Sequence, residues 1–595
     1  MTIPELQAFY KTRKQEFTTA LDAVNDKIQL FSNARLVTAA GFALCFYFLF
    51  STNLMIYPVI LFAATFAVLV AKHSKLFREK THLENLIKIN TNELQSLSND
   101  FSCFKNGTEY IDPKHPYSHD LDIFGGGSLF QYMNRSGTLE GEAALATSLA
   151  NPLMAREQIL ERQQGVLELS QRVDFRQHFL ATSMTLEEFR SDRHQLLEWA
   201  NHKPFLYRNG YYSILLWALP IVTVGFILAS LVFDSLSGIA VLSAVIQWVT
   251  LSMNLKKVNA FHQYISRKKN ILQKYSSLLF LIRREDFKSS LLKKFHDAAA
   301  YGDERVKSLA SLVRSLDARL NFLTNLIVNS ILLYDLQCVY RLERWKEENA
   351  QNLETWLNVI RDLDMLNSIA TMAFNNQDFT FPEITQEQKI KATALAHPLI
   401  SSQERVANDV SIGDPQFILV VTGANMAGKS TFLRTLGVNI VLALSGAPVC
   451  AKKFQCAIIN LRSGMRTADS LQDHQSYFYA ELNRLKSIVD ELRSGKSLFV
   501  LLDEILKGTN STDKQAGSVA LVKQLREYSC LAIIATHDLA LGDLEREYPQ
   551  QVKDYCFEPN IENDQLSFDY ILKPGIAQKM NATFLMKKMG IIPAG

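Results

Sequence analysis

The 595-residue sequence has no cysteine pairs of the C-x-x-C type and no large excess of charge of either sign. Without such pairs, a disulfide scaffold and a zinc knuckle are excluded, and reduced thiols in a cytoplasmic body are indicated. The net charge of +3 excludes a chain-wide basic field for nucleic acid. The first 34 residues lack a short apolar core with a cleavage site, so we expect no signal peptide there. The seven cysteines are Cys45, Cys103, Cys338, Cys450, Cys456, Cys530 and Cys556.

Charge is also missing from two long stretches. Residues 36–71 hold no charged residue, and residues 209–255 hold only Asp234. A short polar break divides each stretch into two apolar segments of about 17 to 23 residues, the length that crosses a bilayer core. Soluble core helices rarely run so far without charge. We therefore expect two transmembrane hairpins, at residues 35–72 and 211–255, with a re-entrant first hairpin as the alternative because its first segment is the shortest.

Lysine and arginine flank both hairpins and are missing from the tips. By the positive-inside rule, both hairpins then enter and leave from the cytoplasm. We expect a multi-pass protein of a bacterial-type inner (plasma) membrane, with the lipid bilayer as a partner and with both termini and the C-terminal domain in the cytoplasm. The flanking cations are Arg35, Lys72, Lys75, Arg78, Lys80, Lys203, Arg208, Lys256 and Lys257.

Residues 423–430 read GANMAGKS, a complete G-x-x-x-x-G-K-S loop. An apolar run precedes it and a helix-like run follows, so a strand, a glycine loop and a helix start occur in order. Such a loop holds phosphates with backbone N–H groups, while Lys429 reaches the outer phosphates and the Ser430 hydroxyl holds Mg²⁺. The sequence therefore predicts a nucleoside triphosphate site. The expected contacts come from Gly423, Asn425, Met426, Ala427, Gly428, Lys429, Ser430 and Thr431.

Two later strand ends complete this predicted site. Asp503 and Glu504 follow the apolar run 497–502. Beside a phosphate loop, we expect Asp503 to hold Mg²⁺ through water and Glu504 to polarise the attacking water as general base. A third apolar run ends at His537, which we expect to sense or orient the γ-phosphate, a structural histidine being the alternative. Lys429, Glu504 and His537 are thus the expected catalytic residues.

A basic tract, residues 256–294, follows the second hairpin. It holds eleven lysines and arginines against two acids, with Phe261, Tyr264 and Tyr275 between them. A basic helical stretch beside a membrane more often binds anionic lipid than DNA. A plain solvated face and a nucleic-acid surface remain as alternatives.

The nucleotide motifs resemble those of the MutS family of ATPases, which are relatives of the ABC-type ATPases. The family loop is close to GPNMGGKS, and Ala424 and Ala427 here replace a proline and a glycine. Residues 503–511, DEILKGTNS, are similar to the family's DEIGRGTS, and residues 535–537 match its ATH. The resemblance implies ATP and Mg²⁺ as ligands.

The resemblance extends over residues 120–200 and 300–590, through the family's core, lever and ATPase regions. Residues 475–481 are similar to the stretch whose serine reaches the nucleotide of the opposite subunit, which implies this role in trans for Ser476. A homodimer through the ATPase domains and DNA binding of the mismatch-repair kind are also implied. The sequence departs from the family in several ways. We expect no mismatch-reading domain before residue 120, and the second hairpin lies where the family carries its DNA clamp.

The predicted fold is an α/β P-loop NTPase domain of the ABC/MutS-like type, joined to an all-α core and lever region with two transmembrane helical hairpins. In chain order, we expect an N-terminal helix at 1–34, the first hairpin at 35–72, a helix and linker at 73–119, outgoing core and lever helices at 120–210, the second hairpin at 211–255, returning lever helices at 256–383 and the ATPase domain at 384–595.

Three functions are compatible with these motifs. The first is a membrane-anchored MutS-like ATPase that closes as a homodimer around ATP and moves its lever helices. The second is a DNA-binding module for mismatched or branched DNA. The third is an ATP-driven membrane switch or transporter without a DNA role, although the spans hold almost no ionisable group to line a pathway. A kinase or GTPase would need a phosphoacceptor pocket or a base-reading motif, and the sequence contains neither.

Overall fold

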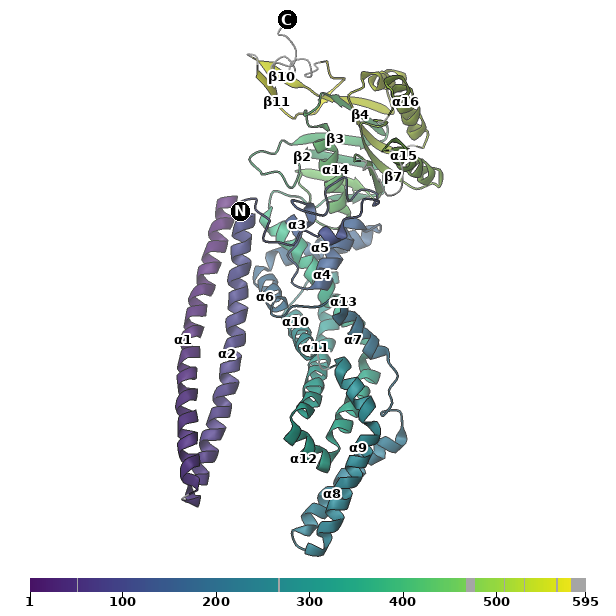
Figure 1. Ribbon diagram of the computed structural model, residues 1–595. Helices are drawn as coiled ribbons and strands as arrows, with labels where there is room; N and C mark the ends of the chain where they lie inside the picture. The colour runs from purple at the N-terminus through teal and green to yellow at the C-terminus, as the bar shows by residue number, and fades with distance from the viewer. Residues whose placement is uncertain are drawn as a thin grey trace.

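The computed structural model describes residues 1–50, 52–265, 268–466, 477–507, 509–528, 530–562 and 565–578. A C-terminal α/β domain forms one end of the molecule, and the tips of two long helical hairpins lie toward the other end (Figure 1). An all-α region connects the α/β domain to the second hairpin.

The first hairpin consists of α1 (Ile3–Leu49) and α2 (Ile56–Ser96), which pack against each other in opposite directions. Both helices continue without a break through the change from polar to apolar sequence, so the expected N-terminal helix and the first apolar segment are one helix. Gly41 allows the two helices to approach closely, because a Cβ atom there would lie 2.7 Å from the Phe62 ring. The short turn between the helices includes a 3₁₀ turn at Asn53–Met55.

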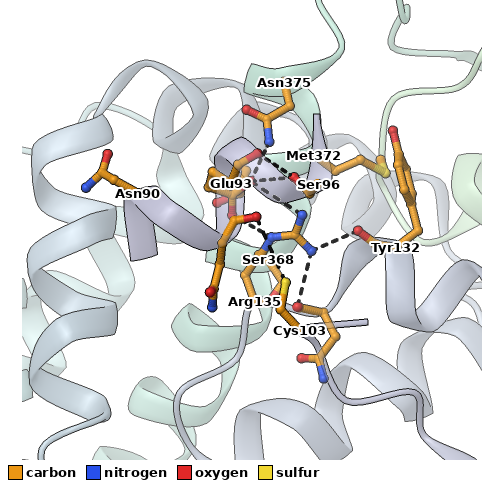
Figure 2. A network of polar contacts seen from close by, with 12 residues as sticks. Asn90, Glu93, Ser96, Cys103, Tyr132, Arg135, Ser368, Met372 and Asn375 are labelled. Carbon is orange, nitrogen blue, oxygen red and sulfur yellow. Dashed lines mark hydrogen bonds and ion pairs between the residues drawn. The ribbon is translucent and has the colours of Figure 1, made fainter. Parts of the chain in front are cut away.

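The base of the first hairpin is tied to the body by a buried polar network (Figure 2). The Arg135 guanidinium donates to Glu93 of α2, with Nε 2.6 Å from Oε1. The guanidinium also stacks over the Phe104 ring. The amide of Asn375 donates to the same carboxylate at 2.8 Å. Tyr10 of α1 in turn donates to Asn375 at 2.7 Å. Both helices of the first hairpin are thus hydrogen-bonded to Asn375, the last residue of α13 (Tyr334–Asn375), which is the longest helix of the all-α region.

The all-α region is organised around α13 (Tyr334–Asn375), which runs from the second hairpin to the α/β domain. Its buried face packs against α4, α5, α10 and α11, and this packing forms the largest hydrophobic core. The other helices of this region are α3 (Leu129–Met133), α4 (Leu139–Ala150), α5 (Arg156–Gln171), α6 (Val173–Ser183), α7 (Ser191–Asn201), α10 (Lys269–Arg284), α11 (Ser290–Asp317) and α12 (Phe322–Leu332).

The second hairpin is formed by α8 (Gly210–Ser230) and α9 (Ser237–Ile265). Within the described residues, four helices are long and apolar enough to cross a bilayer: α1, α2, α8 and the helix that includes α9. The most apolar windows of α1 and α2 are 0% buried, and those of α8 and α9 are 17% and 22% buried. The apolar parts of both hairpins are therefore exposed rather than packed in a protein core.

The α/β domain contains, within the described residues, a six-stranded sheet in the order β12-β9-β4-β8-β7-β6. All its pairings are parallel except that of the edge strand β12. A four-stranded sheet, β1-β5-β2-β3, and the hairpin β10-β11 complete it. The strands are β1 (Glu383–Thr385), β2 (Lys389–Leu395), β3 (Asn408–Gly413), β4 (Ile418–Gly423), β5 (Lys453–Ala457), β6 (Asn460–Gly464), β7 (Leu498–Asp503), β8 (Leu531–Thr536), β9 (Val552–Phe557), β10 (Pro559–Glu562), β11 (Gln565–Phe568) and β12 (Lys573–Pro574).

Helices cover this larger sheet, and the central strands β4, β7 and β8 are almost entirely buried, as expected from the apolar runs in their sequences. Because these strands are parallel, their carboxyl ends meet at one edge, and that edge holds the predicted site. The helices of the domain are α14 (Lys429–Leu444), α15 (Tyr477–Arg493), α16 (Ser511–Glu527) and α17 (Asp543–Glu547).

Candidate nucleotide site

The phosphate loop joins β4 to α14 and adopts a conformation that requires its two outer glycines. Gly423 has a φ of +150°, and a Cβ atom there would lie 2.5 Å from the carbonyl oxygen of Phe557. Gly428, which immediately precedes α14, has a φ of +108°. The positions where the family resemblance fails, Ala424 and Ala427, are both buried within the loop. Two alanines therefore fit without disturbing the turn.

Lys429 lies inside the loop rather than in solvent. Its ammonium donates to the carbonyl oxygens of Gly423 at 2.6 Å and Ala424 at 2.9 Å. Only 5% of the residue is exposed, and this burial lowers its pKa, while Glu504 and Asp503 oppose the shift. The two carbonyl oxygens thus hold the ammonium inside the phosphate loop.

A pocket of about 370 Å³ opens beside the loop. Asn425, Met426, Gly428, Lys429, Ser430, Thr431 and Glu504 all line it, so most of the predicted residues are brought together. The pocket is also lined by the apolar and aromatic residues Ile400, Val406, Phe557 and Tyr570. A pocket lined by a phosphate loop and by aromatic residues has the size and character of a nucleotide site.

Tyr570 and His397 belong to this pocket although the sequence motifs assigned them no role there. The Tyr570 ring lies 3.1 Å from the position that a Cβ on Gly428 would occupy. Asn408 holds this segment, donating to the Tyr570 carbonyl at 3.0 Å and accepting from the Leu572 amide at 2.7 Å. Burial lowers the pKa of His397 to about 4, aided by Arg434, so its ring is neutral at pH 7.

Glu504 lies beside Lys507 and His537 at the carboxyl end of β7. Its Oε1 is 3.6 Å from Nδ1 of His537, and its Oε2 is 3.5 Å from the ammonium of Lys507. Burial would raise the pKa of Glu504, but Lys507, His537 and Lys429 outweigh it and lower the pKa. The carboxylate is therefore ionised at neutral pH and able to accept a proton.

Asp503 ends β7 directly before Glu504 and pairs in register with Ala535 of β8. It is half-buried at the same edge of the sheet as Ser430 and His537. A serine hydroxyl and a carboxylate are hard oxygen ligands of the kind that Mg²⁺ prefers. Ser430 and Asp503 are thus chemically suited to hold a magnesium ion together with water and phosphate oxygens.

The turn after Glu504 contains an unusual backbone conformation. Leu506 has a φ of +60°, in the left-handed region, and stands where the resembling family has glycine. The carboxylate of Glu481, from α15, accepts the Leu506 amide at 2.6 Å. Leu506 also packs onto α16, because a Cβ on Gly517 would lie 2.7 Å from its side chain. One hydrogen bond and one packing contact therefore maintain a conformation that glycine would adopt without strain.

Comparison with known proteins gives this site its family. Residues 419–593 match the family model for MutS domain V, which is a P-loop ATPase domain. This part of the chain belongs to the MutS family. The DNA mismatch repair protein MutS of Thermotoga maritima is 28% identical over 249 residues, which are 41% of this chain and 31% of that protein. The MutS of Aquifex pyrophilus is 30% identical over 287 residues, or 47% of this chain and 32% of that protein.

The chain thus aligns with about a third of the length of the MutS proteins it matches. The MutS of Chloroflexus aurantiacus gives a similar result, with 26% identity over 301 residues, which are 49% of this chain and 31% of that protein. The resemblance to MutS is confirmed for the region that carries the nucleotide site. Ser476, the residue predicted to act in trans, lies outside the described residues.

Part of the basic tract at residues 256–294 is paired with acids. Among its described residues, five cations lie beside carboxylates from other parts of the chain, and Tyr275 is buried. These cations would have to leave their partners before contacting phosphates. The pairs are Lys268 with Asp192, Lys269 with Asp317, Lys274 with Glu188, Arg283 with Asp303 and Glu304, and Lys294 with Glu161.

Proposed function

We propose that the chain is a membrane-anchored ATPase that works as a homodimer and uses ATP to move the lever helices α10, α11 and α13 relative to the bilayer. The observation that carries this proposal is the arrangement of the molecule. A phosphate-loop pocket lies at one end, and two exposed apolar hairpins extend toward the other (Figure 1).

The nucleotide chemistry is assigned to residues of the pocket. Lys429 would exchange the carbonyl oxygens of Gly423 and Ala424 for phosphate oxygens, and Ser430 and Asp503 would hold Mg²⁺. Bound Mg²⁺ and ATP supply the transferable phosphoryl group and neutralise its developing charge. Glu504, already ionised, would take a proton from the attacking water. His537, whose Nδ1 is 3.6 Å from the Glu504 carboxylate, would orient that carboxylate.

The exposed surface of the hairpins supports the membrane assignment. Phe50 at the first tip and Leu231 at the second are 83% and 80% exposed. Soluble proteins rarely expose apolar surfaces of this extent. Tyr211, Tyr212 and Lys257 gather at the base of the second hairpin, with Lys257 over the Phe205 ring. Aromatic and basic residues of this kind are typical of a membrane interface on the cytoplasmic side.

Membrane fractionation tests this location. We expect the full chain to remain with bacterial inner membranes after an alkaline carbonate wash, with the C-terminal domain accessible to protease only from the cytoplasmic side. Recovery of the chain in the soluble fraction after that wash would refute the anchoring.

The homodimer is tested with the nucleotide held in place. Glu504→Gln in the presence of Mg²⁺ and ATP should increase the mass measured by light scattering in detergent from one chain to two. Adding Ser476→Ala to this variant should reduce the dimer. A mass that does not respond to ATP in either variant contradicts a nucleotide-dependent dimer.

DNA binding is the second candidate and rests on the names of the matched MutS relatives. A protein that neutralises several phosphates loses affinity steeply as salt rises. Duplex, mismatched and branched DNA should therefore be titrated against the detergent-solubilised chain at two salt concentrations. The absence of salt-sensitive affinity for all three would leave an ATP-driven membrane switch or transporter without a DNA role.

A further inference from the structure

The lever helices α11 and α13 are joined by an apolar element, residues 321–334. Residues 321–334 contain no charged residue and include all of α12. Ile327, near the middle of α12, is 57% exposed, and Leu326 is exposed beside it. The 11 residues of α12 extend for about 16 Å, roughly half the thickness of a bilayer core.

Contacts with the second hairpin show how far along its apolar helices α12 lies. α12 packs against both α8 and α9. Trp248 of α9 donates to Ser330 at 2.8 Å, and Gln247 donates to the carbonyl of Ile331 at 3.0 Å. Gln247 precedes Lys256, the first cation at the base of α9, by nine positions, or about 13 Å along the helix. The end of α12 therefore lies beside the middle of an apolar helix.

The helix break between α12 and α13 has its backbone groups bonded to side chains. Leu333, at the break, has a φ of +48° and donates its amide to Gln247 Oε1 at 2.9 Å. The Asp335 amide donates to Asn329 at 2.9 Å. Gln247 and Leu333 are both fully buried. A break with bonded amides is the form of irregular backbone that hydrocarbon tolerates, since open amides there are costly.

The charged residues on either side of residues 321–334, Arg319 and Asp335, are paired with each other. Arg319, before α12, donates to Asn259 of α9 at 2.8 Å and lies 3.0 Å from the carboxylate of Asp335. Asn259 is on the body side of Lys256, where hairpin 2 leaves its apolar segment. Arg319 thus connects the polar end of α9, at Asn259, to Asp335, the acid that follows residues 321–334. Ionisable residues within a membrane are usually found in such pairs.

We propose that α12 is a re-entrant helix, inserted into the cytoplasmic leaflet beside the second hairpin (hairpin 2, α8 and α9) and covered by lipid acyl chains. The inference rests on the proposed membrane insertion of hairpin 2. Lipid is the occupant because the exposed side of α12 continues the exposed apolar surface of α8 and α9 at the same depth. The tip of the lever then moves within the bilayer itself, with Gln247 as its joint to the hairpin.

A fluorophore on single introduced cysteines in the full chain tests this in liposomes. The native cysteines that stay in the chain are all buried: Cys338, Cys450, Cys456, Cys530 and Cys556. Ile327→Cys reports on α12, Val241→Cys on hairpin 2 and Leu167→Cys on the exposed surface of α5, with Cys45 and Cys103 replaced by alanine. Lipids that carry a nitroxide quencher on the acyl chain near the headgroup are compared with unlabelled lipids. Leu326→Cys provides a second α12 position, and retained ATPase activity shows that each variant is folded.

We expect the nitroxide lipids to reduce fluorescence at Ile327→Cys and Val241→Cys to a similar degree and to leave Leu167→Cys unchanged. Quenching at Val241→Cys but at neither α12 position would overturn the re-entrant helix and leave the membrane proposal standing. Quenching at none of the positions would overturn the membrane proposal, and the inference with it.

Discussion

The Arg135 guanidinium and the Glu93 carboxylate form a buried ion pair, with Nε 2.6 Å from Oε1. Glu93 lies on α2 of the first hairpin, and Arg135 lies in the segment that leads into the helical core. Asn375, at the end of α13, binds the same carboxylate. The chain enters the α/β domain only a few residues later, at β1. This pair therefore joins the first hairpin, the core and the entrance to the ATPase domain.

Breaking this pair should detach the first hairpin. Removing one partner leaves a buried charge, so Glu93→Gln should lower the free energy of unfolding by about 3–5 kcal/mol. Asp174→Asn is the matched control, because its pairing with Arg13 leaves the carboxylate 81% exposed and should contribute at most about 1 kcal/mol. Thermal unfolding in detergent measures both. Equal effects of the two substitutions would show that the Glu93 pair does not anchor the hairpin.

Substitutions in the phosphate loop and at Glu504 should affect ATP binding and ATP hydrolysis differently. Lys429→Ala removes the ammonium that would meet the phosphates, so nucleotide binding should be lost. Glu504→Gln keeps the pocket but cannot accept a proton, so ATP should bind while hydrolysis falls by about 10²–10⁴-fold. Equilibrium binding of a fluorescent ATP analogue and phosphate release distinguish the two. Normal hydrolysis by Glu504→Gln would mean that another group is the base.

Replacing Gln247 should loosen the joint between hairpin 2 and the lever. Gln247→Leu leaves the Leu333 amide and the Ile331 carbonyl without their side-chain partner, a loss of about 1–3 kcal/mol. Asn254→Leu is a control of similar burial, since Asn254 bonds to Tyr212 and Thr250 within the hairpin and not to the lever. Distances between spin labels on α8 and α12 should broaden only in Gln247→Leu. The same broadening in both variants would place the joint elsewhere.

The first hairpin should also dock less tightly in acid. His82 of α2 and His178 of α6 are 2.8 Å apart between ring nitrogens. Burial, with His178 adding to it, lowers the pKa of His82 from 6.5 to about 4, and burial lowers that of His178 as well. The undocked rings bind protons below pH 6.5 and the docked rings do not, so docking should weaken as pH falls from 6.5 toward 4.

Hydrogen exchange of the α2 and α6 amides at pH 7 and pH 5 measures this effect. His82→Gln keeps a donor but does not titrate, so its exchange should change less between the two pH values. An equal change in the wild-type chain and in His82→Gln would assign the pH dependence to other groups.

The nucleotide site was largely predictable because its motifs are local. The phosphate loop, Asp503-Glu504 and His537 each follow an apolar run, and parallel strands bring their ends together. Tyr570 could not be assigned, since Asn408 holds it over the loop from 162 positions away. The MutS resemblance covered this position without indicating its place in the pocket.

The helical part was less predictable, because burial and pairing there depend on distant elements. The basic tract looked available for phosphates or lipid, yet Lys274 is paired with Glu188 from the segment preceding α7. Gln247 is one polar residue in an apolar run, and its partner Leu333 is 86 positions away. The change of composition near residue 35 suggested a boundary, whereas backbone hydrogen bonding continues through it.

The unbroken course of α1 has a geometric consequence. At 1.5 Å per residue, its 47 residues form a rod of about 70 Å. The contacts of α1 with the all-α region lie toward its N-terminal end, at Tyr10, Arg13 and Phe17, so a small rotation there is magnified along the rod. A tilt of about 5° at the Tyr10 contact would displace the far end of α1, about 58 Å away, by roughly 5 Å. Small rearrangements beside the ATPase entrance would therefore become displacements about as wide as a lipid chain.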